Sequence, residues 1–115
     1  MQKRSIINNI YKHLDKTRVT SHIYTDNDWS GKDRVVNDIE NAIDKINIKH
    51  NTEYALSFSD SHYEGVIGEL GHCKKYEYNI IDADSNEIVN IEITCAFCGK
   101  ISDPMGAYDC TVIMW

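Results

Sequence analysis

The fold is decided by residues 76–94, which read YEYNIIDADSNEIVNIEIT. Apolar and polar residues alternate on both sides of a central polar run, and this is the period of a strand with one buried face. The apolar positions are Tyr76, Tyr78 and Ile80 before the run and Val89, Ile91 and Ile93 after it. The run itself, residues 82–86, is rich in Asp, Ser and Asn, which favour turns. The stretch therefore predicts an antiparallel hairpin.

Upstream of this hairpin, the apolar residues recur with the period of a helix. One stripe comprises Ile6, Ile7, Ile10, Tyr11 and Leu14, and a second comprises Val35, Val36, Ile39, Ala42, Ile43 and Ile46. The two stripes predict helices over residues 3–16 and 31–48. Ser30 and Asp33 resemble a capping box at the start of the second helix, after a polar loop.

The remaining segments predict further strands. Tyr54, Leu56 and Phe58 alternate with small residues, and residues 108–115 form a last strand. Glycines at positions 65, 68 and 71 make the segment between them either a loop or a bulged strand. Two N-terminal helices followed by an antiparallel sheet of three to five strands constitute an α+β fold. A chain of 115 residues is expected to form a single domain, over residues 1–115.

The composition excludes several classes of protein. The chain is 42% hydrophobic, so it can bury a core, and its net charge of −6 disfavours a basic nucleic-acid-binding domain or a polybasic membrane binder. No apolar run is long enough for a signal peptide or a membrane span. We therefore expect a cytoplasmic protein whose four cysteines stay reduced.

The negative charge belongs to the second half of the chain. Residues 1–50 carry nine Lys and Arg and seven Asp and Glu, whereas residues 51–115 carry three and eleven, so the two balances are +2 and −8. Six carboxylates fall in predicted loops and turns: Asp60, Glu64, Glu69, Asp82, Asp84 and Glu87. Gathered at neighbouring edges of one sheet, they form a negative surface that attracts a basic protein partner.

Aromatic residues supply anchors for such a partner wherever they are exposed. The candidates are Trp29, Tyr63, Tyr76 and Tyr78. The alternative interpretation of the acidic half is ordinary solubility, because a net negative charge keeps many proteins soluble without binding anything.

The cysteines suggest a metal site. Cys95 and Cys98 have the spacing of one zinc knuckle and are followed by a glycine. A structural zinc needs four ligands, so Cys110 and Cys73, or His72 in place of Cys73, would complete the set. A second paired motif is missing, however, and Cys95 continues the apolar phase of the preceding strand. Buried core cysteines are the competing interpretation.

The sequence contains no recognisable catalytic motif. Ser59, Asp60, Ser61 and His62 are the right residue types for a triad, but adjacent residues of a strand alternate between faces. The glycines at 65, 68 and 71 match neither a dinucleotide fingerprint nor a P-loop. The basic residues of the first helix fit a solvated face. We therefore predict no catalytic residues and no enzymatic activity.

Small size, acidity and an Ile-, Asn- and Lys-rich composition are typical of small neutralising proteins of bacteria and phages. We expect a non-enzymatic protein-binding inhibitor that needs no cofactor and binds neither membrane nor nucleic acid. Two versions fit: an immunity protein that neutralises a cationic toxin, or a phage-type inhibitor of a host defence protein. The partner has a basic surface, as a nuclease or a nucleic-acid-binding protein does. The alternative is a small interaction domain stabilised by one structural zinc.

Overall fold

The computed structural model describes the backbone of the chain except at residues 18–22, 25–29, 67–71 and 98–106. Side chains are described for residues 1–14, 33–62, 74–95 and 110–115. The elements are α1 (Lys3–Thr17), β1 (Ile23–Tyr24), α2 (Ser30–His50), β2 (Ala55–Val66), β3 (His72–Ile81), β4 (Glu87–Phe97) and β5 (Ala107–Met114). Neither helix is long and apolar enough to cross a membrane.

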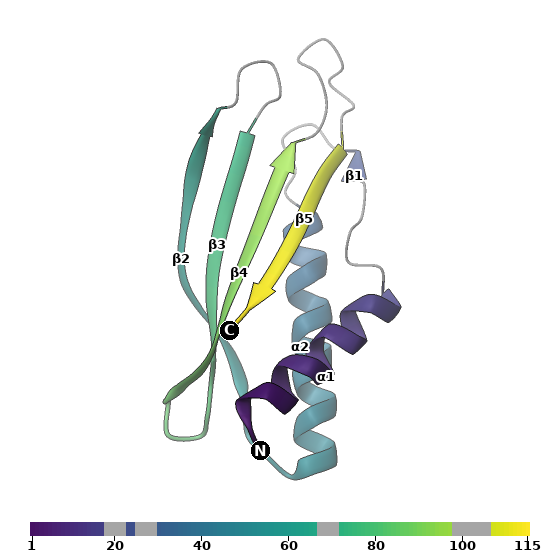
Figure 1. Ribbon diagram of the computed structural model, residues 1–115, viewed down its shortest axis with the longest axis vertical. Coiled ribbons are helices and arrows are strands. Elements are labelled where there is room, and N and C mark those ends of the chain that lie inside the picture. The colour runs from purple at the N-terminus through teal and green to yellow at the C-terminus, as the bar shows by residue number, and fades with distance from the viewer. Residues whose placement is uncertain (18–22, 25–29, 67–71, 98–106) are drawn as a thin grey trace.

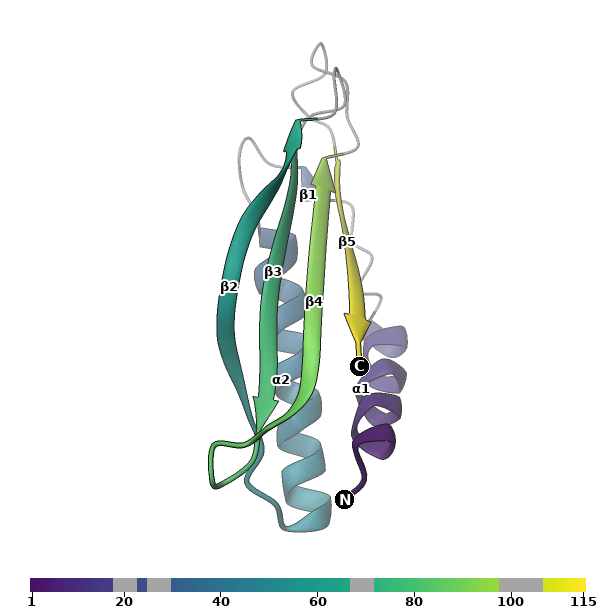
Figure 2. The ribbon, with the colours of Figure 1, turned by 60° about the vertical axis from the view of Figure 1, so that its left-hand side comes forward.

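The described strands form one antiparallel sheet with the order β1-β5-β4-β3-β2. Strands β2 to β5 follow one another as a meander, and both helices pack on one face of it (Figures 1 and 2). The other face carries no helix (Figure 2). This arrangement confirms the α+β fold with two helices N-terminal to an antiparallel sheet. The two-residue strand β1, which pairs with the start of β5, was not expected from the sequence.

The predicted hairpin is β3–β4, and its turn has a defined geometry. Ser85 donates its N–H to the carbonyl of Asp82 at 3.0 Å, and Asp82 donates to the carbonyl of Asn86 at 3.1 Å. Ser85 has a φ of 64°, so a type I turn followed by a left-handed residue connects the strands. This loop fixes the register, in which Tyr78 pairs with Ile91.

Strand β2 is longer than predicted. The expected strand at 54–58 is its first part, and pairing with β3 continues to Val66. The register shifts between Phe58 and Asp60 and again between Tyr63 and Gly65. Of the two interpretations of the glycine segment, a bulged strand describes the part up to Val66, and residues 67–71 lie outside the described residues. The bulges bend an edge strand, which discourages pairing with other chains.

The core lies between the sheet and the two helices. It is made of aliphatic side chains from α1, α2, β3 and β4, and Ile10, Ile39, Ile80 and Ile93 are fully buried. The Tyr11 hydroxyl fastens α1 to β5, because it accepts the N–H of Met114 at 3.0 Å and donates to the carbonyl of Val112 at 3.4 Å.

The end of α2 is fixed by its own hydrogen bonds. Asn51 takes a left-handed φ of 53°, and Thr52 donates its N–H to the Asn47 carbonyl at 3.2 Å, as in a Schellman motif. The side chain of Asn47 then accepts the N–H of Tyr54 at 2.9 Å and donates to its carbonyl at 2.9 Å. One amide therefore sets the angle at which the chain leaves α2 and enters β2.

Two isoleucines of α2 test the assignment of its buried face. Ile39 is fully buried and Ile48 is 84% exposed. Ile39→Ala is expected to lower the free energy of unfolding by about 2–5 kcal/mol, because it leaves a cavity in the core. Ile48→Ala, its matched control, is expected to change it by less than about 0.5 kcal/mol. Urea denaturation measures both, and equal losses would contradict the assignment.

Candidate functional site

The sheet face that carries no helix is polar, because most apolar residues of the strands point to the other face and form the core. Along β3 and β4 the residues that alternate with the buried ones point away from the helices, because side-chain direction in a strand has a period of two. Rows of these residues cross the strands in register. Glu77 pairs with Asp60 on one side and with Glu92 on the other, and Lys75 likewise pairs with His62 and Thr94. We call this surface the open face.

A row of three carboxylates crosses the open face. Asp60, Glu77 and Glu92 are direct neighbours on three adjacent strands. Like charges directly opposite each other destabilise a sheet. Glu92 is partly compensated, because Lys75 Nζ lies 3.3 Å from its Oε1. The row thus places three carboxylates on adjacent strands, and Glu92 has an ion pair among the described residues.

Two exposed apolar side chains adjoin the carboxylate row on β5 and just after it. Ile113 pairs with Glu92 and is 49% exposed. Trp115 exchanges two backbone hydrogen bonds with Asn90, at 2.8 and 3.0 Å, and is 50% exposed. Trp is among the residues enriched at protein-binding surfaces, where it acts as an anchor.

A second group of carboxylates lies at the β3–β4 turn. The Asp82 carboxylate accepts the N–H groups of Asp84 and Asn86, both at 2.9 Å, and the Asn86 side-chain amide at 3.1 Å. The hydrogen bonds from Asn86, followed by the one from Asp84, hold the pKa of Asp82 below its ordinary value. Asp82 thus organises the turn, while Asp84 and Glu87 are exposed.

The structure therefore divides the six predicted carboxylates. Asp82, Asp84 and Glu87 lie together at the turn, and Asp60 lies on the open face beside Glu77. Glu77 is five residues from Asp82 along β3, or roughly 16 Å. The backbone of Glu64 belongs to β2 but its side chain is not described, and Glu69 lies outside the described residues. Glu77 and Glu92, which sequence reasoning missed, belong to the open-face group.

The structure tests two of the four expected aromatic anchors. Tyr76 and Tyr78 are buried under the helices, so they are unavailable as anchors. The side chains of Trp29 and Tyr63 lie outside the described residues, so their role stays a prediction. Among the described side chains, Trp115 and Phe58 are exposed, and Phe58 packs edge-on against Tyr78 with ring centroids 5.4 Å apart.

The cysteines are only partly described. Cys95 and Cys110 pair in register on β4 and β5, and both are buried in the core. Cys73 pairs with Ala96 through the backbone, its side chain is not described, and Cys98 lies outside the described residues. Among the described residues, no group of three or more His, Cys, Asp or Glu side chains is placed to hold a metal. The zinc site stays a prediction.

The residue types of a triad are separated on β2. Asp60 and His62 pair with Glu77 and Lys75 on the open face, whereas Ser61 pairs with the buried Tyr76. Consecutive residues on opposite faces of a strand do not assemble a catalytic group locally.

Neither a protein-family model nor a curated protein nor a solved structure matches this chain.

The Asp82 hydrogen bonds make the turn sensitive to acid. Because folding lowers the pKa of Asp82, its contribution to stability is present above the ordinary pKa of 3.8 and is lost as pH falls through the lower folded value. A carboxyl titration by NMR is expected to give a midpoint below 3.8, with the Asp84 and Asn86 amides shifting in step. In the variant Asp82→Asn, the pH-dependent shift that follows the Asp82 titration should be absent from the amides of Asp84 and Asn86. A midpoint of Asp82 at or above 3.8 would contradict this account of the turn.

Proposed function

We propose that the protein is a non-enzymatic cytoplasmic inhibitor that binds the basic functional surface of another protein. Its binding surface comprises the open face and the acidic β3–β4 turn. The versions that fit are an immunity protein that neutralises a cationic toxin and a phage-type inhibitor of a host defence protein.

The observation that carries the proposal is the carboxylate row. Placing Asp60, Glu77 and Glu92 directly side by side opposes folding, and only Glu92 has a described ion pair. A basic partner supplies the missing positive charge, so repulsion in the unbound protein becomes attraction in the complex. Ordinary solubility requires only a net charge and does not require carboxylates in register on adjacent strands.

Trp115 and Ile113 supply the apolar part of the interface. Charged groups alone give fast association and orientation, whereas buried aromatic anchors contribute most of the binding energy at protein interfaces. The exposed Trp115 is adjacent to the carboxylate row, so a partner that contacts the row also covers the indole.

Steering by charge explains why such a protein is suited to inhibition. Enzymes and proteins that bind nucleic acid collect positive charge at their functional surface. A negative sheet face competes with the phosphate backbone of the nucleic acid for that surface. The opposite charges of the two proteins also accelerate their association at low ionic strength. Association is therefore expected to weaken with added salt.

Matched charge reversals test this function. Asp60→Lys/Glu77→Lys reverses the open face, and Glu40→Lys/Asp44→Lys makes the same charge change on exposed positions of α2. A basic partner captured from cells of the source and then purified is titrated calorimetrically against all three proteins. We expect the open-face variant to lose about ten-fold or more in affinity and part of its salt dependence. We expect the α2 variant to bind like the unmodified protein.

Asp84→Lys/Glu87→Lys extends the test to the turn, and it leaves the hydrogen-bonding carboxylate of Asp82 in place. A far-ultraviolet spectrum and a melting curve confirm that each variant is folded. Equal affinity of the unmodified and open-face proteins for the partner would reject the proposal, as would a partner whose activity is unchanged by stoichiometric binding.

A further inference from the structure

A basic groove of about 230 Å³ lies between α1 and α2, on the helix layer of the molecule. Its polar lining consists of Asn9, Lys12 and His13 from α1 and Lys45, Lys49 and His50 from α2. Ala42 and Ile46 contribute its apolar floor. No carboxylate lines it, although the chain as a whole carries a net charge of −6.

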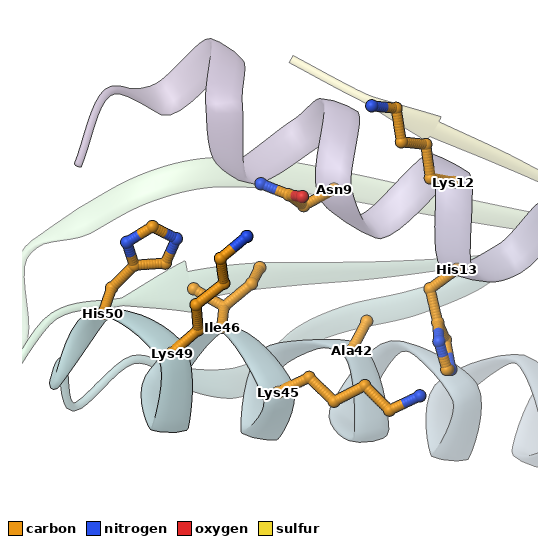
Figure 3. Close-up of a pocket in the computed structure, with 8 residues that line it drawn as sticks. All are labelled: Asn9, Lys12, His13, Ala42, Lys45, Ile46, Lys49 and His50. Carbon is orange, nitrogen blue, oxygen red and sulfur yellow. The ribbon is translucent and has the colours of Figure 1, made fainter.

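Side chains from both helices line the groove (Figure 3). His13 extends from α1 toward α2, and Lys49 extends from α2 toward α1. Lys45 runs along α2 with its ammonium on the side of His13, while Lys12 points away from α2 and stands at the rim. Among the residues with described side chains, none forms an ion pair with Lys12, Lys45 or Lys49.

The charges of α2 are divided between two sides of the helix. Lys45 and Lys49 are four residues apart and line the basic groove. Glu40 and Asp44 are also four residues apart and line a separate depression against β2. Lys49 and His50 stand in the last turn of α2, where positive charge also interacts favourably with the helix dipole. The groove therefore collects the cations at the C-terminal end of α2, apart from the carboxylates of the same helix.

From this arrangement we infer that the groove binds a phosphate group, either inorganic phosphate or the phosphate of a small phosphomonoester. Such a group carries nearly two negative charges at pH 7 and several acceptor oxygens. Lys45 and Lys49 supply charge-assisted hydrogen bonds, and the amide of Asn9 and the imidazole of His13 supply further polar contacts. The apolar floor at Ala42 and Ile46 accommodates the organic part of a phosphomonoester.

The size of the groove and its place in the fold limit the ligand. At about 230 Å³ it is smaller than the pockets that enclose drug-sized ligands, which fits a phosphate with a few attached atoms. It lies between α1 and α2, which pack on one face of the sheet (Figure 2), whereas the carboxylate row lies on the open face. The groove is therefore a separate surface from the proposed partner surface.

Amide chemical shifts of the full-length protein test the site. Inorganic phosphate, glycerol 2-phosphate and sodium chloride are titrated separately at pH 7 and equal ionic strength. We expect saturable shifts from the two phosphates at residues 9–13 and 45–50 and none from chloride. Tighter binding of glycerol 2-phosphate identifies a phosphomonoester as the ligand, and tighter binding of inorganic phosphate identifies the free anion.

The variant Lys45→Gln/Lys49→Gln removes two cations from the groove, and Lys3→Gln/Arg4→Gln removes two exposed cations elsewhere on α1. We expect the first to weaken phosphate binding about ten-fold or more and the second to leave it unchanged. A melting curve confirms that both variants are folded. Shifts that chloride reproduces, or equal weakening by the two variants, would overturn the inference.

Discussion

The structure depends on the one-sided covering of its sheet by two helices. Because α1 and α2 bury the face formed by Tyr78, Ile80 and Ile91, the intervening residues of β3 and β4 must point to the uncovered side. The hairpin turn sets the register, and the register brings Glu77 opposite Glu92. The carboxylate row of the open face is thus a direct consequence of how the core is filled.

The local features were predictable from the sequence, while the surfaces were not. Alternation at Tyr76–Ile80 and the turn-forming residues after it act over short distances, so the β3–β4 hairpin and both helices were correctly expected. The carboxylate row requires the pairing of three strands, which depends on a bulge between Phe58 and Asp60 that no local pattern indicates. The alternation itself places Tyr76 and Tyr78 in the phase of the buried Ile80, and the structure confirms that phase over their expected role as exposed anchors.

The two charged surfaces of the molecule lie on different layers. The carboxylate row occupies the sheet face without helices, and the basic groove lies between α1 and α2. Each places like charges next to each other, so the two surfaces carry local potentials of opposite sign.

The most direct test of this account is the stability of Glu77→Gln in the absence of any partner. Glu77 stands between Asp60 and Glu92, and Glu53→Gln removes an exposed carboxylate outside the row as a control. If the row opposes folding, urea denaturation of Glu77→Gln at low salt will show a free energy of unfolding higher by about 0.5 kcal/mol. That gain should fade in ~1 M salt, which screens the repulsion. A loss of stability in Glu77→Gln would contradict the account, since the carboxylates would then be stabilised within the protein and need no basic partner.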